Sequence, residues 1–305
     1  MATTGSTGEI NLTTRADKKV LERFKLKSVT QGLFSNAYSF TGVKTVQIPS
    51  IDVVPLNNYN AELVTGASRY GDLVNLGDTL QEFTMTQNKS FIFAIDETYN
   101  TDQQQIKRAG ECLRREVDEI IIPTVDKYRL AKIADAAPAD CIQTLAESYF
   151  AKDKIVNTIF TANAAMSDKK VPVEGRVLYM SYQDAVNMKL ADQVVGIDKL
   201  GEKAIVNGAF GKIDATQIRL VPSDYMPDGV VFMIVKTGIS LAPTKIKKYA
   251  IHDGAHILNG KIVTGQLYHD CFVMGKGEVD NVTGKNKVRG IIVVKSESRG
   301  STGET

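Results

Sequence analysis

The sequence contains no tryptophan and only three cysteines among its 305 residues. Cys112, Cys141 and Cys271 lie far apart, and an odd count without CxxC spacing argues against a disulfide framework or a zinc site. We expect them to be buried free thiols, the usual state of such cysteines. Aromatic residues make up 7% of the chain, so no stacking platform for single-stranded nucleic acid is expected.

Strong charge of one sign and long apolar runs are also missing. The net charge of +2 gives no global bias toward nucleic acid, membranes or acidic substrates. Apolar runs such as 230–235 and 291–294 are far shorter than the roughly 20 residues needed to cross a bilayer. The first residues, MATTGSTGE, lack the basic start and apolar stretch of a signal peptide, so we expect synthesis in a cytoplasm.

The longest regular pattern predicts a helix over residues 101–134. Thr101 is its expected N-cap, and Gln104 stands at the capping-box position. Apolar residues recur at a spacing of three to four along one side, while the other side is charged. Pro123 removes a backbone hydrogen bond and crowds the carbonyl of Glu119, so we expect a kink, or a break into two helices near residue 122. A helix bundle is the alternative, but the neighbouring segments alternate as strands do.

A projecting two-stranded flap is expected before this helix. Residues 43–51 alternate in polarity as one arm, and residues 82–95 as the other. The roughly 30 residues between them are more than a compact domain usually holds as a loop, and long loops are either functional or disordered. The tip is rich in amides, at Asn57, Asn58 and Asn60 beside Tyr59, which suits contact with a protein surface.

The rest of the chain predicts an α+β fold. One or two helices are expected over 140–166 after a break at Pro138, followed by a turn at 172–175 and buried strands at 176–180 and 230–235. Short extended segments at 245–251, 260–267, 271–275 and 288–295 predict an antiparallel meander, part of which packs on the long helix.

Residues 15–27 form a basic amphipathic arm. Its basic side chains are Arg15, Lys18, Lys19, Arg23, Lys25 and Lys27, with Val20 and Phe24 as a thin apolar stripe. A surface helix with a solvated face is one interpretation. The equal alternative is an arm that docks on a neighbouring subunit or faces a polyanion.

Few residues suggest catalysis or metal binding. His252 and His256 are four apart, with His269 and Cys271 downstream, but the glutamate of an HExxH site is absent. The glycine-rich stretch 207–212, NGAFGK, matches neither phosphate-binding pattern, GxxxxGK[ST] or GxGxxG. We therefore expect no catalytic residue, no cofactor and no metal. A metal-dependent α+β enzyme that uses the 252–271 cluster remains an alternative.

The order of these elements resembles the major capsid proteins of tailed bacteriophages, which share the Hong Kong 97 fold. Two stretches carry the resemblance. One turn and strand is formed by Val171, Pro172, Gly175, Arg176 and Ser181. The glycine turn and strand that follow are formed by Asn207, Gly208, Gly211, Ile213, Val221, Ser223 and Pro227.

The resemblance implies a division into four parts. These are an N-terminal arm at 1–42, an extended β-hairpin loop at 43–96, a peripheral domain with the long spine helix at 97–137 and 236–305, and an axial α/β domain at 138–235.

The implied function is structural. Copies of the chain would form the pentamers and hexamers of an icosahedral head, the capsid of a virion, around a double-stranded DNA genome. A separate scaffolding protein and a portal are implied partners, and no membrane is. We expect subunit contacts at Asn57, Asn58, Tyr59 and Lys89 of the flap, and sequence-independent DNA contacts at the six basic residues of the arm. An encapsulin-like nanocompartment shell is the alternative within this fold.

Overall fold

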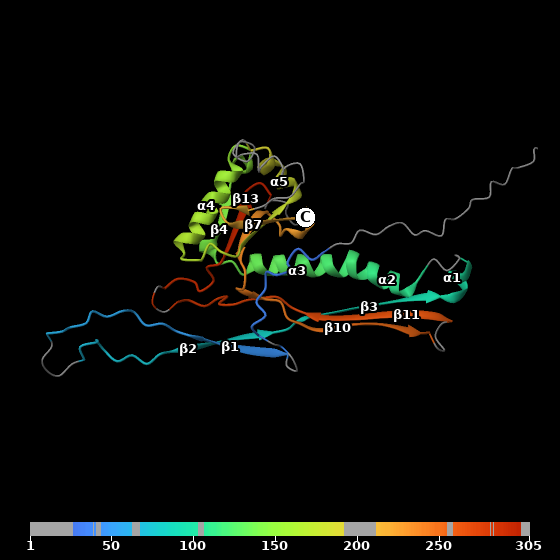
Figure 1. The fold of residues 1–305 in the computed structure, drawn as a ribbon, viewed down its shortest axis with the longest axis horizontal. Coiled ribbons are helices and arrows are strands. Elements are labelled where there is room, and N and C mark those ends of the chain that lie inside the picture. Colours follow the sequence, from blue (N-terminus) through green and yellow to red (C-terminus); the bar gives the residue numbers. More distant parts are fainter. Residues whose placement is uncertain are drawn as a thin grey trace, which may run out of the picture.

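A computed structural model describes residues 27–38, 40, 44–62, 68–102, 107–191, 212–254, 259–280, 282 and 284–299. Figure 1 shows an elongated molecule in which a long helix lies between a compact α/β unit and a flat layer of strands. A narrow pair of strands projects beyond both.

The compact unit is built on a six-stranded mixed sheet with the strand order β4-β13-β8-β5-β7-β6. β4 is parallel to β13 and β7 is parallel to β5, while the other neighbours are antiparallel. The strands are β4 (Ile142–Leu145), β5 (Arg176–Ser181), β6 (Lys212–Ile213), β7 (Thr216–Val221), β8 (Val230–Lys236) and β13 (Ile291–Ser296). The strands expected at 176–180 and 230–235 are thereby confirmed.

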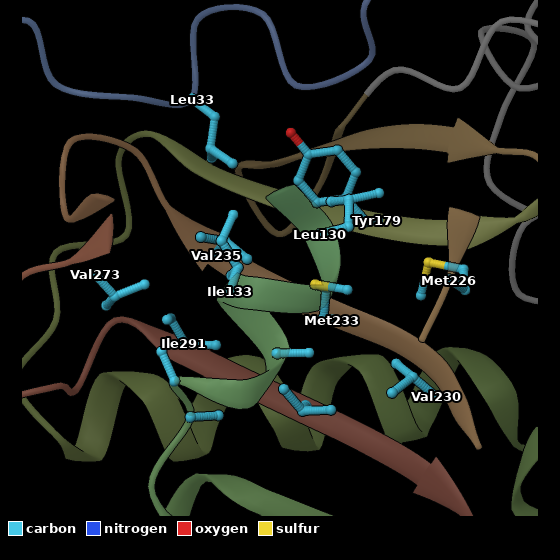
Figure 2. Packing of buried hydrophobic residues seen from close by; sticks show 14 of the residues in the cluster. Leu33, Leu130, Ile133, Tyr179, Met226, Val230, Met233, Val235, Val273 and Ile291 are labelled. Atoms are coloured by element: carbon cyan, nitrogen blue, oxygen red, sulfur yellow. The ribbon is translucent and has the colours of Figure 1, made fainter. Parts of the chain in front are cut away.

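Both faces of this sheet are apolar, which is why its central strands read as continuous apolar runs. In β8, Phe232 and Ile234 face α4 (Ile155–Asp168) and α5 (Tyr182–Lys189). Met233 and Val235 face α3 (Ile122–Asp135) on the opposite side. Figure 2 shows this second cluster, with the labelled residues Leu33, Leu130, Ile133, Tyr179, Met226, Val230, Met233, Val235, Val273 and Ile291.

The long helix begins later than expected. Thr101 lies inside a separate short helix, α1 (Glu97–Asp102), so it is not the N-cap, and Gln104 lies outside the described residues. The rod consists of α2 (Ala109–Glu116), a π-helical turn (Val117–Ile121) and α3. We call Ala109–Asp135 the spine helix. Within the described ranges no helix is long and apolar enough to span a bilayer.

Pro123 is accommodated by the π-helical turn that precedes it. The amide of Ile122 donates to the carbonyl oxygen of Val117, five residues back. Such a wider turn relieves the crowding that a proline ring causes, and Pro123 sits in the first turn of α3, where a missing amide costs little. Where the sequence predicted a kink or a break near residue 122, the structure has a π turn within one rod.

The flat layer contains two separate sheets. β10 (Thr244–Asp253), β11 (Gly260–His269) and β3 (Gln87–Asp96) form an antiparallel sheet, with α1 and α2 against β11. The projecting hairpin pairs β1 (Thr45–Ile51) with β2 (Asp78–Thr84). The prediction of one continuous arm at 82–95 is therefore wrong, because the chain breaks between Thr84 and Gln87 and changes its partner from β1 to β11.

Two further expectations are corrected by strand pairing. The segment 138–166 contains the strand β4 and the 3₁₀ turns Ala139–Cys141 and Glu147–Phe150 before its single helix, α4. The last expected strand of the meander, β13, instead joins the six-stranded sheet between β4 and β8. Short pieces complete the fold: the pair β9 (Ser240–Leu241) and β12 (Phe272–Val273), and a 3₁₀ turn at Ser223–Tyr225.

A buried arginine ties the turn before β5 to the end of α4. The side chain of Arg176 is fully enclosed. Its guanidinium donates to the backbone oxygens of Asn163 (2.9 Å), Val171 (2.6 Å) and Pro172 (3.2 Å), and to Oγ of Ser167 (3.0 Å). The C-terminal end of a helix favours a positive charge, and the end of α4 binds the guanidinium of Arg176 in this way.

We expect Arg176→Met to lower the free energy of unfolding by about 3 kcal/mol or more, because several buried carbonyl oxygens lose their donor. Urea unfolding followed by circular dichroism measures the loss. The matched control is Arg114→Met, at an exposed position on α2, which should change stability by no more than about 0.5 kcal/mol. Equal effects of the two substitutions would contradict this role.

Candidate assembly surface

We call residues 45–84 the flap. Its root is a small apolar cluster, in which the rings of Phe40 and Phe83 lie 5.7 Å and 5.2 Å from the ring of Phe272. The buried members of this cluster are Phe40, Ile48, Phe83, Met85 and Leu241. The base of the flap is thus fixed to the body by the packing of buried apolar side chains.

Burial is lost along the flap toward its tip. Ile48 near the root is 7% exposed, whereas Leu80 and Ile51 are 60% and 70% exposed. Beyond Ile51 the two sides no longer form a strand ladder. Across the described part, backbone hydrogen bonds join Asp52 to Gly77 and Asn60 to Arg69, each 3.0 Å long. We call residues 52–62 and 68–77 the distal flap.

The distal flap exposes a series of aliphatic side chains. Leu56 and Leu73 are 101% and 97% exposed, values that correspond to no contact with the rest of the chain. The full series is Val53, Val54, Leu56, Leu73, Val74 and Leu76. Burying one such side chain contributes about 1.5–3 kcal/mol, and grouped exposed apolar residues mark interaction sites. The distal flap is therefore a surface that another molecule can cover.

The amide-rich tip holds the two sides of the distal flap together. Nδ2 of Asn57 donates to the backbone oxygen of Tyr70 at 3.3 Å. The ring of Tyr59 meets that of Tyr70 edge-on, with 5.1 Å between centroids. Asn58 is exposed. Contact of Asn57, Asn58 and Tyr59 with another subunit stays a prediction.

Lys89 does not lie on the flap, contrary to the expectation. It belongs to β3, where it pairs with Leu267 of β11, and its side chain is exposed. The aliphatic series of the distal flap was not predicted from the sequence. A signal was available, because valine and leucine recur there within a stretch otherwise rich in asparagine, glycine and aspartate.

Asp270 joins the spine helix to the chain just after the last flap strand. Its buried carboxylate accepts hydrogen bonds from the amide of Thr86 (2.6 Å), Oγ1 of Thr86 (2.9 Å), the hydroxyl of Tyr128 (2.6 Å) and the amide of Cys271 (2.8 Å). Thr86 lies between β2 and β3, so this carboxylate fixes the point at which the strand leaves one sheet for the other. Burial, with Asp270 alongside, raises the pKa of Tyr128, which stays a hydrogen-bond donor.

A second buried carboxylate, Asp126 on α3, holds the N-terminal segment. It accepts hydrogen bonds from Oγ of Ser28 (2.8 Å), the amide of Val29 (2.8 Å) and Oγ1 of Thr30 (2.6 Å). From the six-stranded sheet, Arg219 donates to the backbone oxygens of Val29 (2.9 Å) and Gln31 (2.6 Å). Both anchors fix residues 28–31 on the body.

The basic residues of the arm lie outside the described part of the chain, except Lys27, whose side chain is exposed. Their expected contact with DNA is therefore still a prediction.

The two described histidines, His252 and His269, do not gather into a site. His252 lies in β10, where its Nε2 is 3.2 Å from Oγ1 of Thr264. His269 ends β11 against the ring of Tyr128, and burial lowers its pKa. His256 lies outside the described residues. Across the described ranges, no three His, Cys, Asp or Glu side chains are grouped to hold a metal ion.

All three cysteines are free thiols. Cys141 and Cys271 are buried, as predicted, whereas Cys112 is only partly buried. Burial raises the pKa of the Cys271 thiol to about 12, so this thiol remains protonated in the fold.

Nearly all of the chain superimposes on solved bacteriophage structures. The capsid of cyanophage P-SCSP1u matches with a TM-score of 0.72 at 12% identity, covering 94% of this chain and 93% of that one. A structure from Mycobacterium phage Che8 has a TM-score of 0.72 at 15% identity, covering 94% and 98%. The mature capsid of bacteriophage PhiM1 gives 0.68 at 13% identity, covering 95% and 93%. No protein-family model and no curated protein sequence matches this chain.

The fold is therefore that of a viral shell subunit. More narrowly, it is the fold of bacteriophage capsid proteins, and the α+β capsid fold expected from the sequence is confirmed.

Tyr179, which lies in the six-stranded sheet beside residues 28–31, makes the stability of the fold depend on pH. Burial raises the pKa of Tyr179 to about 12, and its hydroxyl lies 3.3 Å from the backbone oxygen of Val29. Above about pH 10 the unfolded chain releases this proton and the folded chain keeps it, so stability is complete below about pH 10 and falls as the pH rises further.

In the wild type, the proton on Tyr179 makes the free energy of unfolding fall by about 1.4 kcal/mol per pH unit above about pH 10. We expect Tyr179→Phe to lack this part of the slope. Urea unfolding at several pH values between about 9 and 12 measures this slope. Tyr182→Phe, at an exposed position, is the matched control. The same slope in the wild type and in Tyr179→Phe would contradict the prediction.

Proposed function

We propose that this chain is the major capsid protein of a bacteriophage and that its copies assemble into the icosahedral head that encloses double-stranded DNA. The capsid fold supports this proposal. The main support is the series of exposed aliphatic side chains on the distal flap. No feature of the described residues favours the nanocompartment shell or the metal-dependent enzyme.

The physical argument rests on the exposed apolar series. A flap whose leucines contact nothing in their own chain gains no stability from being extended, and ordering its backbone costs roughly 1–2 kcal/mol per residue. A second copy that covers the flap supplies the missing apolar contacts. Obligate interfaces commonly bury about 2,000–5,000 Å² or more, and a flap that reaches beyond the body adds to such an area.

The proposed parts follow the strand pairing. Residues 1–42 are the N-terminal arm and the flap is the extended loop. The peripheral domain consists of the spine helix with β3, β10 and β11, and the axial domain is the six-stranded unit, including β13. Compared with the division expected from the sequence, β3 moves from the loop to the peripheral domain and β13 from the peripheral to the axial domain.

The proposed assembly has the following partners. Copies form pentamers and hexamers of a virion shell, with contacts that include Asn57, Asn58, Tyr59 and Lys89. The arm presents Arg15, Lys18, Lys19, Arg23, Lys25 and Lys27 to DNA phosphates, in a sequence-independent and salt-sensitive manner. A separate scaffolding protein and a portal complete the head, and the chain is made in the host cytoplasm. Its role is structural and not catalytic.

We expect the double substitution Leu56→Ser and Leu73→Ser to abolish shells while leaving the subunit folded, because two side chains that touch nothing in the monomer lose their apolar contact in the assembly. Stability of the monomer should stay within about 0.5 kcal/mol of wild type. Negative-stain electron microscopy and sedimentation velocity report assembly. Val186→Ser, at an exposed apolar position on α5, is the control. Normal shells from the double variant would refute the proposed role of the flap.

A further inference from the structure

The flap is fastened to the body at a second place besides its apolar root. Nζ of Lys287 lies 3.3 Å from Oδ1 of Asp52 and 3.1 Å from Oε2 of Glu278. It also lies 3.4 Å from Oγ of Ser50 in β1. The lysine is 19% exposed and both carboxylates are 13% exposed, so this group is largely shielded from solvent. The hydrogen bond with Glu278, followed by that with Asp52, raises the pKa of Lys287.

Gln81 makes a second directional contact on the opposite strand of the flap. Its Oε1 accepts from the amide of Gly275 at 2.7 Å, and its Nε2 donates to the backbone oxygen of Lys276 at 3.1 Å. Lys287 therefore holds β1 and its continuation, whereas Gln81 holds β2. Both reach the same stretch of chain, residues 275–289.

This stretch is itself a braced hairpin. The amide of Lys287 donates to the carbonyl oxygen of Glu278 at 2.9 Å, and the amide of Asp280 donates to that of Lys285 at 2.8 Å. Nη2 of Arg289 lies 3.0 Å from Oδ2 of Asp280. The two sides of the hairpin therefore hold each other, and it can transmit force between the elements it contacts.

The hairpin also contacts the six-stranded unit. Nδ2 of Asn286 donates to Oδ1 of Asp140, in the turn before β4, at 3.1 Å. Two residues beyond Arg289 the chain enters β13. The hairpin, drawn in orange-red in Figure 1, thus bridges the flap and the compact unit.

We propose that residues 275–289 act as a strut that sets the angle at which the flap leaves the body, and that Lys287 is the positioning residue of this strut. The apolar root cannot set this angle alone, because apolar packing is not directional. Hydrogen bonds and ion pairs do fix direction. This inference rests on the proposed function, since the flap angle would determine how neighbouring copies meet and therefore the diameter at which a shell closes.

Lys287→Met tests the strut. Without the ammonium group, Asp52 and Glu278 face each other as shielded like charges and push the flap base away from the hairpin. In unassembled protein we expect amide hydrogen exchange of residues 45–51 and 78–84 to accelerate about tenfold, while the buried strands β8 and β13 keep their protection. Lys287→Arg should restore most of the protection. Lys285→Met is the matched control, an exposed lysine on the same hairpin.

Shell geometry is the second readout. Wild type and Lys285→Met should give shells of one diameter, and Lys287→Met should give mixed diameters or open tubes in electron micrographs. Flap exchange in Lys287→Met equal to that in Lys285→Met, or shells of unchanged diameter, would overturn the proposal. Should Lys287→Met fail to fold, Gln81→Ala tests the same strut at its other contact, with the same exchange readout. Absence of wild-type shells when the scaffolding protein is supplied would refute the proposed function instead, and the exchange comparison would still decide whether the strut exists.

Discussion

The packing of α3 against the six-stranded sheet is the contact on which the other parts depend. Leu130 and Ile133 are fully buried in it. One turn earlier on the same helix, Asp126 accepts hydrogen bonds from residues 28–30, and Tyr128 donates to Asp270, which in turn binds Thr86 just after the last flap strand. Two residues of one helical turn thus fix residues 28–30 and the base of the flap on the body. A displacement of α3 would move both together.

The chain combines a well-packed body with an extension that it does not cover itself. The body has two apolar layers, one on each face of the sheet, and buried polar groups such as Arg176, Asp126 and Asp270 with hydrogen-bond partners. By contrast, apolar exposure rises along the flap from its root to Leu56. This contrast within one chain is typical of a subunit whose folding is completed by its neighbours. It is the physical reason to infer assembly from the fold.

Sequence patterns predicted the elements that depend on local signals. The apolar runs at 176–180 and 230–235 predicted buried strands, which the structure contains. Pro123 predicted an irregularity in the long helix, and a π turn lies directly before it. Errors arose where a distant residue decides the outcome. Asp270, far along the chain from Thr86, ends the second flap strand early. The sheet that β13 joins is decided by its pairing with β4 and β8, which are distant in sequence. Its apolar composition alone cannot select between the two sheets.

The sequence predicted where the projecting flap lies in the chain, but not that it exposes a series of aliphatic side chains. Length and composition indicated a projecting segment between two strands. The amides at its tip suggested polar contacts, but Asn57 and Tyr59 serve to hold the two sides together. The aliphatic residues were missed because valine and leucine in a sequence are expected to be buried, and exposure is a property of the folded chain. Likewise, nothing in the sequence near Lys287 indicates that Asp52 is its partner.

The central claim is that another copy of this chain covers the distal flap. Cryo-electron microscopy of the particles formed by the wild-type protein tests it most directly. We predict that Leu56 and Leu73 lie buried against a neighbouring subunit in a closed shell. A shell in which both leucines remain in solvent, or a monomer at all concentrations in which the flap folds back onto its own body, would contradict the account.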